Sequence, residues 1–226
     1  MNRIEIIDRF RQENPEFTAN VISDTVLKSW LFTGDKETCA KARLTVDSDS
    51  FSATTNESRY DPNALLPKFF DVDEYPGGGI SYVTTAGVEK RLIKTTKAEL
   101  DSIRQSWRTQ SSEKPKYYFR RGKYIHFFPA PDSTIDSFNI DFVKISEDFD
   151  NDSETPFDQQ SNLVPFHYSL VLYLKMRAKA KAGKPEDAKS AMDEYNTYLA
   201  WIIKEIGGGK YGTIQFKPPA MRMRFR

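Results

Sequence analysis

The sequence has little cysteine and no long hydrophobic stretch. Cys39 is its single cysteine, so no disulfide can form within the chain, which is typical of proteins that fold in a reducing compartment. The first residues, MNRIEIIDRF, are charged and amphipathic and lack the apolar centre of a secretory signal. No uncharged apolar run approaches the roughly 20 residues that a membrane-spanning helix needs. We therefore expect a soluble protein that is made in the cytoplasm and has no membrane partner.

The chain also lacks a marked excess of either charge. Its 33 Lys and Arg residues against 32 Asp and Glu give a net charge of +1, whereas a dedicated nucleic-acid-binding domain usually carries an obvious basic excess. The charge is unevenly distributed, because the chain from Pro165 onward holds twelve Lys and Arg against five Asp and Glu, a net charge of +7. The residues before Pro165 must then sum to −6. Such a polarised subunit can bind a partner of complementary charge.

Residues that usually carry catalysis or bind metals are scarce. The two histidines, His126 and His167, have no CxxC or HxxxH spacing beside them, so a closed zinc site would need carboxylate help. Cys39 could be a nucleophile only with a histidine brought beside it, and its neighbours Thr38 and Ala40 suit a small buried residue instead. There is no GxSxG, HExxH or kinase motif. We expect a protein that is not an enzyme and that has no cofactor.

One acidic pattern imitates a metal site. Asp148, Asp150 and Asp152 alternate like the first ligands of a calcium-binding loop. Ser153 and Gln159, however, stand where that loop needs glycine and a bidentate glutamate. We interpret the segment from 149 to 162 as a polar surface loop, and we expect no metal ion.

The first part of the chain has helical patterns. Ile4, Ile7 and Phe10 recur at three-residue spacing, which predicts a short amphipathic helix that Pro15 ends. A Thr-Gly pair at 33–34 is typical of a helix end. Three helices are therefore predicted: Asn2–Glu13, Thr18 or Ala19 to Phe32, and a short helix that Asp35 caps.

The pattern changes near Leu44. From there to about Ile145, β-branched and aromatic residues alternate with polar ones between Gly, Pro, Asn and Asp turns, which predicts strands. The clearest strands are Ile80–Thr84, Tyr117–Arg120, Tyr124–Phe128 and Phe138–Val143, with a weaker one at Leu92–Thr95. The turn at 121–123 joins two of them into a hairpin. Thr96 and Glu99 form a capping box for a short helix, Lys97–Ser106.

Two long helices follow. Pro165 opens one that runs to about Ala182, and Gly183 ends it. The next begins at Lys184-Pro185 and ends at the glycines 207–209, with apolar residues at helical spacing. Helices joined so closely must pack antiparallel.

These elements predict an α+β fold with an antiparallel helical base built from both chain ends. We expect a discontinuous helical domain, residues 1–45 and 164–206, a β-rich insertion domain, 46–163, and an extended basic tail, 207–226.

The tail is the strongest candidate for a binding site. From residue 210 onward it contains no Asp or Glu, and its last six residues, MRMRFR, alternate apolar and basic side chains. An extended conformation would place the apolar residues on one face and the arginines on the other. A disordered terminus is the default for chain ends, and phosphate contact is a third reading. We favour docking on a partner, by strand addition to a sheet edge. The predicted partner-binding residues are Lys210, Tyr211, Ile214, Phe216, Lys217, Met221, Arg222, Met223, Arg224, Phe225 and Arg226.

The serial order of the segments resembles that of a known family. A helical start ending in WLF at 30–32 precedes LLPKFF at 65–70 and ISYV at 80–83. Then come YYFRRGKYI at 117–125, FFPAP at 127–131, VPFHY at 164–168 and the PEDA helix that starts at Pro185. Over roughly residues 20–206 this order is similar to the head-to-tail connector adaptors of short-tailed bacteriophages. The acidic segment near Asp148 and the arginine-rich end have no counterpart in that pattern.

The resemblance implies a structural virion protein. In the family, the helical base docks on the portal protein, the β-rich insertion faces neighbouring subunits or the tail, and a C-terminal extension commonly reaches along the portal. Copies usually form a twelve-fold ring around the DNA channel in the neck of the virion, assembled in the host cytoplasm. The partners implied are the portal, other tail or neck proteins, neighbouring copies and non-specifically contacted DNA. Two alternatives remain: another neck or tail-ring component, and a nucleic-acid-binding protein that uses the basic C-terminal surface.

Overall fold

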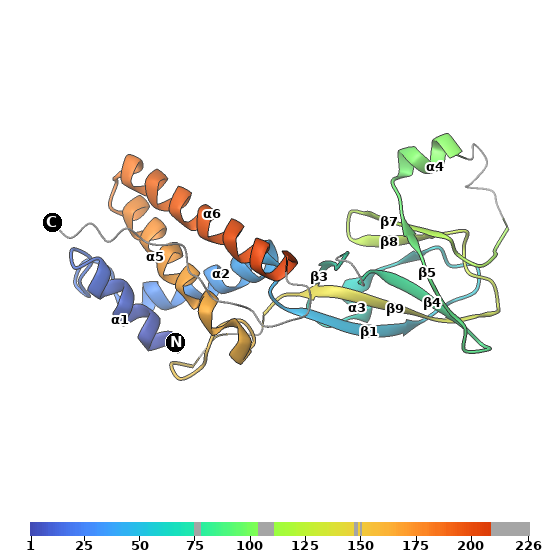
Figure 1. The fold of residues 1–226 in the computed structure, drawn as a ribbon, viewed down its shortest axis with the longest axis horizontal. Helices are drawn as coiled ribbons and strands as arrows, with labels where there is room; N and C mark the ends of the chain where they lie inside the picture. The colour runs from blue at the N-terminus through green and yellow to red at the C-terminus, as the bar shows by residue number, and fades with distance from the viewer. Residues whose placement is uncertain (75–77, 104–110, 147–148, 150, 209–226) are drawn as a thin grey trace. The chain divides into compact units, whose positions relative to one another are not determined.

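The chain folds into two compact units that alternate along the sequence. The computed structural model describes residues 1–74, 78–103, 111–146, 149 and 151–208 (Figure 1). The helical unit comprises Met1–Leu44 and the chain from Ser146 onward, and the β unit comprises Thr45–Ile145. Helices account for 43% of the structure and strands for 23%, which confirms the predicted α+β class.

The helical unit contains most of the predicted helices. Its elements are α1 (Arg3–Glu13), α2 (Asp24–Ala42), a 3₁₀ helix (Ser161–His167), α5 (Tyr168–Lys181) and α6 (Pro185–Gly208). α1 begins with a capping box, in which the Glu5 N–H donates to the Asn2 side chain and the Asn2 N–H donates to the Glu5 carboxylate, both at 2.9 Å. α5 and α6 pack side by side and are joined by only three residues, so they run antiparallel as predicted.

α5 is the central helix of this unit. Every residue from 169 to 174 is buried, so this part of the helix is covered on all sides. α1, α2 and α6 each pack against it. A helix that is apolar all round belongs in the middle of a bundle, and the two chain ends are therefore held together by the burial of α5.

α2 differs from its prediction. The structure has one continuous helix from Asp24 to Ala42 where the sequence predicted a break at Thr33-Gly34 and a separate short helix after it. Gly34 stays helical because its missing side chain makes room for Tyr173 of α5: a Cβ at this position would lie 2.6 Å from the ring atom Cδ1. The glycine therefore serves close helix packing and not helix termination.

Replacing Gly34 by alanine tests this explanation. In an open helix the change would stabilise by about 1 kcal/mol. Here the added methyl group meets a buried ring that also packs edge-on against Tyr195, with ring centroids 5.6 Å apart. Overpacking of this kind costs about 1–3 kcal/mol, so Gly34→Ala is expected to lower the free energy of unfolding in urea. Ser29→Ala, at an exposed position of the same helix, is the control and should stay within about 0.5 kcal/mol of the wild type.

The β unit consists of two sheets. The strands are β1 (Val46–Ser52), β2 (Arg59–Tyr60), β3 (Phe69–Val72), β4 (Ile80–Thr84), β5 (Glu89–Arg91), β6 (Ile93–Lys94), β7 (Tyr117–Arg121), β8 (Tyr124–Phe128) and β9 (Ile135–Lys144). Sheet A has the order β1-β9-β4-β5, with β3 also paired to β9, and sheet B has the order β2-β8-β7-β6. Two short helices, α3 (Pro62–Leu65) and α4 (Lys97–Ile103), lie between strands. The predicted β7–β8 hairpin is confirmed, with Tyr117 opposite Phe128.

An aromatic core joins the two sheets. Phe138 of β9 stacks on Phe127 of β8 with ring centroids 3.9 Å apart and an interplanar angle of 7°. Phe51 and Tyr60 surround this pair, each 5.6 Å from the Phe138 ring. On the outer face of sheet B, Leu100 of α4 is buried with further aromatic residues of β7 and β8. The outer face of sheet A carries polar side chains instead.

The segment after residue 145 differs from its prediction. The β-rich insertion was expected to continue to residue 163, whereas the structure groups Ser146 and the following residues with the helical unit. Phe149 and Phe157 explain the difference, because both rings are buried in the core of that unit. Aromatic residues within an acidic segment therefore anchor it, although its polar neighbours suggested a surface loop.

Candidate interaction surfaces

The eleven predicted partner-binding residues, from Lys210 to Arg226, lie outside the described residues. The described candidate surfaces therefore lie on the two units themselves. Cys39 is fully buried in the helical unit, whereas His126 belongs to the β unit, where it stacks on Phe119 with ring centroids 4.8 Å apart.

The other histidine is also a packing residue. His167 is buried, and burial lowers its pKa to about 4, so the ring is neutral near pH 7. Its Nδ1 lies 2.9 Å from the amino group of Met1, and its ring packs edge-on against Phe157. Within the described part of the chain, no group of three or more His, Cys, Asp or Glu side chains could hold a metal ion.

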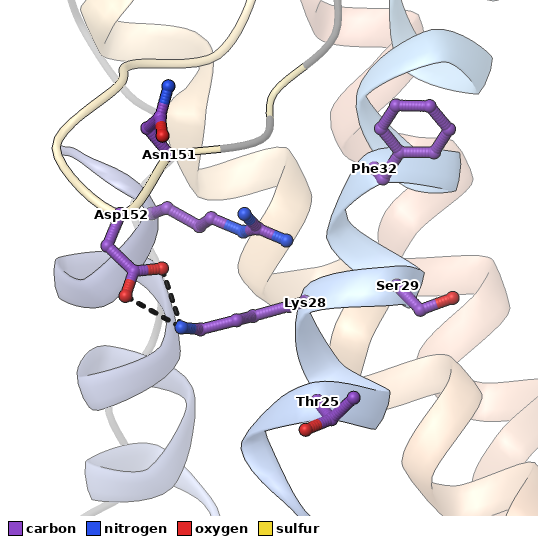
Figure 2. A pocket seen from close by; sticks show the side chains of 7 residues that line it. Thr25, Lys28, Ser29, Phe32, Asn151 and Asp152 are labelled. Carbon is purple, nitrogen blue, oxygen red and sulfur yellow. Dashed lines mark hydrogen bonds and ion pairs between the residues drawn. The ribbon is translucent and has the colours of Figure 1, made fainter.

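An open hollow in the helical unit lies beside α2 (Figure 2). Thr25, Ser29 and Phe32 line it from α2, and Lys28 reaches across to Asp152, with Nζ 2.6 Å from Oδ1 and 2.7 Å from Oδ2. Asp152 thus pairs with a lysine, and the rest of its acidic run, Asp148 and Asp150, lies outside the described residues. Both partners are partly exposed, so the pair contributes at most about 1 kcal/mol.

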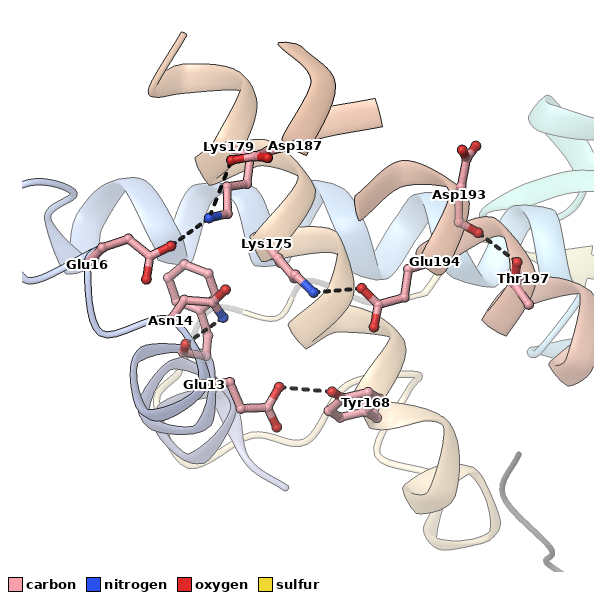
Figure 3. A network of polar contacts seen from close by, with 11 residues as sticks. Glu13, Asn14, Glu16, Tyr168, Lys175, Lys179, Asp187, Asp193, Glu194 and Thr197 are labelled. Carbon is pink, nitrogen blue, oxygen red and sulfur yellow. Dashed lines mark hydrogen bonds and ion pairs between the residues drawn. The ribbon is translucent and has the colours of Figure 1, made fainter. Parts of the chain in front are cut away.

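Polar contacts link α5 to α6 and to the chain around α1 (Figure 3). The Tyr168 hydroxyl donates to Glu13 at 2.9 Å, and burial together with this carboxylate raises the pKa of the tyrosine. Lys179 lies 2.6 Å from Glu16, which lowers the pKa of that carboxyl, and Lys175 lies 2.6 Å from Glu194. These partly exposed pairs orient the helices and leave charges of both signs on the surface.

Two further cations of α5 lie over an aromatic ring. Arg177 and Lys181 are each 5.7 Å from the centre of the Trp30 ring of α2. Cations stand at every second position of this part of α5. Lys175 and Lys179 pair with carboxylates, while Arg177 and Lys181 lie over the indole. Contacts of this kind are worth about 0.5–1 kcal/mol at exposed sites. The positive charges of this helix are therefore largely engaged in contacts within the helical unit.

The outer face of α6 is partly apolar. Met192 is 43% exposed and Ile203 is 38% exposed. They lie eleven positions apart, which is close to three helical turns, so both point to the same side. A pair of exposed aliphatic side chains on one helical face is suited to contact with another protein.

The outer face of sheet A is a hydroxyl and carboxylate surface. Ser48 Oγ donates to Asp141 at 2.5 Å, and Asn139 donates to Glu89 at 3.1 Å. Ser81 also donates to Glu89, and these hydrogen bonds lower the pKa of that carboxyl. Shallow hollows follow this face. Glu89, Asp141 and Arg91 line it, and no described element of the β unit covers it.

β1 forms one edge of this sheet and was not predicted from the sequence. Its residues are exposed except Phe51, and it pairs with β9 from Val46 opposite Val143 to Ser52 opposite Ser137. In the described chain, no strand pairs with its other side. Asp and Ser are depleted in strands, which is why the DSDS sequence gave no strand signal. The alternation of Asp47 and Asp49 before a buried aromatic was the available clue.

Comparison with known proteins agrees with this picture. The structure has two units with exposed polar and apolar faces, and Cys39 and His167 are buried. The chain belongs to the SU10 adaptor protein family, whose model matches residues 1–210. This is a family of structural phage adaptors and not of enzymes, so the resemblance to head-to-tail adaptors is confirmed.

The family makes the protein a phage adaptor that interacts with other head or tail proteins and is a component of the virion. A comparison with curated proteins gives no match. None of the helices in the described chain combines the length and the apolar character needed to cross a membrane.

Proposed function

We propose that this protein is the subunit of an adaptor ring that docks beneath the portal and joins the phage head to the tail. Twelve copies would surround the channel through which DNA passes, in the neck of a virion assembled in the host cytoplasm. The observation that carries the proposal is the family match over residues 1–210, which spans both structural units. The protein would act by binding alone, without a cofactor.

The helical unit is the part that we assign to the portal. Its outer α6 face offers Met192 and Ile203, whereas its α5 cations are engaged with neighbouring carboxylates and with Trp30. An apolar contact surrounded by charges of both signs suits a specific protein partner. The β unit, with its polar sheet face, would face neighbouring copies and the tail.

Binding to purified portal tests this assignment. The full chain is expected to add to the portal ring, and native mass spectrometry should give twelve copies. Glutamate at both Met192 and Ile203 should weaken binding at least tenfold, because two charges would be buried in an apolar contact. Val88→Glu is the matched control: Val88 is 50% exposed in the β unit, and its replacement should leave portal binding unchanged.

Other results would contradict the proposal. A chain that does not bind portal but binds an assembled tail would be another tail-ring component. A chain whose main partner is DNA would lose affinity by orders of magnitude between low and moderate salt, since each phosphate contact releases counterions. Portal binding that persists in moderate salt would reject that nucleic-acid alternative.

A further inference from the structure

The free edge of β1 has a defined pattern of backbone groups. At the two ends of its ladder with β9, the Lys144 N–H donates to Thr45 at 2.8 Å and the Ala53 N–H donates to Asp136 at 2.9 Å. Backbone groups alternate sides along an antiparallel strand, so the odd-numbered residues between these ends face β9. Ser48 and Ser50 therefore direct their N–H and C=O groups outward. In the described part of the chain, their carbonyl oxygens accept no hydrogen bond.

The side chains of two aspartates accept hydrogen bonds from the outward N–H groups. Asp47 accepts from the Ser48 N–H at 2.9 Å, and Asp49 accepts from the Ser50 N–H at 2.7 Å. Both carboxylates are exposed. Charged residues on an edge strand discourage pairing with arbitrary strands. The same residues leave two carbonyl acceptors and two negative charges at regular spacing, so the edge is selective for a basic strand.

The C-terminal segment has the complementary sequence. Arg222, Arg224 and Arg226 recur at every second residue, as Asp47 and Asp49 do. In strands this spacing is roughly 6.7 Å, and paired strands lie about 4.8 Å apart, so arginines on the aspartate face can reach the carboxylates. Charge-assisted bonds between guanidinium and carboxylate are among the strong ones. The three apolar residues of the segment would then share the face of Val46, which is 48% exposed, and would lie beside the hydroxyls of Ser48 and Ser50.

We propose that the outer edge of β1 binds residues Met221–Arg226 of a neighbouring copy of this chain as an added strand. The inference rests on the proposed ring, because a ring supplies a neighbour at a fixed position for every copy. Twelve residues separate Gly208 from Met221, and extended chain of that length spans roughly 40 Å, enough to reach an adjacent subunit. Each copy then donates one strand and receives one, a head-to-tail contact that closes with the ring.

Disulfide trapping in the full chain tests the contact. Ser50→Cys is combined in turn with Met221→Cys, Met223→Cys or Phe225→Cys, because cross-strand Cα distances fit a disulfide. Cys39 is buried and does not compete. With rings assembled on portal, at least one pair is expected to give covalent multimers at tenfold or greater yield over the control pair Ser102→Cys with Met223→Cys. Ser102 is exposed on α4, away from β1.

Exchanging the charges of the β1 aspartates and the C-terminal arginines is a second, independent test. Lysine at both Asp47 and Asp49, or glutamate at both Arg222 and Arg224, should each lower trapping at least tenfold, and the two changes in one chain should restore it. Rings that assemble on portal without trapping above the control would overturn the tail contact and leave the proposed function standing. Products linked only within one chain would overturn the neighbour assignment. Failure of any ring to form on portal would instead contradict the proposed function.

Discussion

Replacing Phe138 by alanine is expected to lower the free energy of unfolding of the β unit by about 3–5 kcal/mol. The side chain is fully buried at the centre of β9, the strand that pairs with β1, β3 and β4. It stacks on Phe127 and contacts Phe51 and Tyr60, so its loss removes the ring that joins the two sheets. The cavity could not be filled without moving several other aromatic rings.

Hydrogen exchange during urea unfolding measures this loss for each unit separately, because the helical and β units have separate cores. β9 amides should exchange at lower urea in the variant, while α5 amides should keep their wild-type midpoint. Phe138→Leu preserves much of the volume and should lose less. Asn139→Ala, the next residue on the polar face, is the control and should change stability little. A Phe138→Ala protein whose β9 amides are as protected as in the wild type would contradict this account of the core.

The elements that the sequence predicted well are those whose periodicity matches their burial. In β8, partly exposed Tyr124 and His126 alternate with buried Ile125 and Phe127, and the hairpin with β7 follows from its tight turn. α6 also follows its apolar spacing. The prediction failed where one contact from a distant segment overrides a local signal. Gly34 is such a case, since a glycine after threonine looks like a helix end until Tyr173 is placed against it.

The start of α2 shows the same limit. The sequence predicted a helix from Thr18 or Ala19, but α2 begins at Asp24 and Val21 is 57% exposed. Hydrogen bonds from Val21 and Ile22 back to the Thr18 carbonyl form a turn there instead. Arg11 of α1 then donates to the Ile22 carbonyl and pairs with Asp24, which positions the new helix start. Contacts between separate helices are not visible in a local pattern.

The candidate surfaces were less predictable than the fold. The basic tail was identified from its alternation, but β1 was missed because Asp and Ser lack strand propensity and pair only through β9. The proposed partner surface on α6 was not predicted, for a related reason. A helical stripe shows which residues are apolar, and it does not show that Met192 lies beyond the edge of the covered face.

Replacing Asp35 by alanine is the second change that we expect to cause a large loss of stability. Its carboxylate is buried in the helical unit, where Oδ1 accepts from the Phe157 N–H at 2.9 Å and Oδ2 accepts from the Ser146 hydroxyl. It therefore ties α2 to both ends of the segment that precedes the 3₁₀ helix. Asp35→Ala would leave two buried donors without their acceptor, and each such donor costs about 1–3 kcal/mol. We expect a loss of about 2–4 kcal/mol in the free energy of unfolding at pH 7.

Asp35→Asn is the matched variant, because the amide oxygen can still accept from Phe157 while the charge is removed. Burial raises the pKa of Asp35 to about 6, against the pull of the hydrogen bonds from Ser146 and Phe157. Burying the charge therefore works against folding at pH 7, and the asparagine variant avoids that cost. It should be close to wild type in stability and well above the alanine variant. An alanine variant as stable as the asparagine one would show that the acceptor is dispensable.

The raised pKa of Asp35 also determines how its contribution to the free energy of unfolding depends on pH. Between about pH 4 and pH 6 the folded carboxyl keeps a proton that the unfolded one has lost. The Asp35 contribution is thus fully present below about pH 4 and is lost as the pH rises through 6, an effect of about 3 kcal/mol. His167 acts in the opposite direction over the same range, because its lowered pKa makes stability fall as the pH drops from about 6.5 toward 4.

The contributions of Asp35 and His167 to the pH dependence of the free energy of unfolding therefore offset each other in the wild type. Asp35→Asn removes the Asp35 contribution and leaves that of His167, so the variant should lose about 3 kcal/mol more stability than the wild type on acidification in urea titrations from pH 7 to pH 4. An unchanged difference between the two proteins across that range would mean that Asp35 is ionised in the folded state throughout.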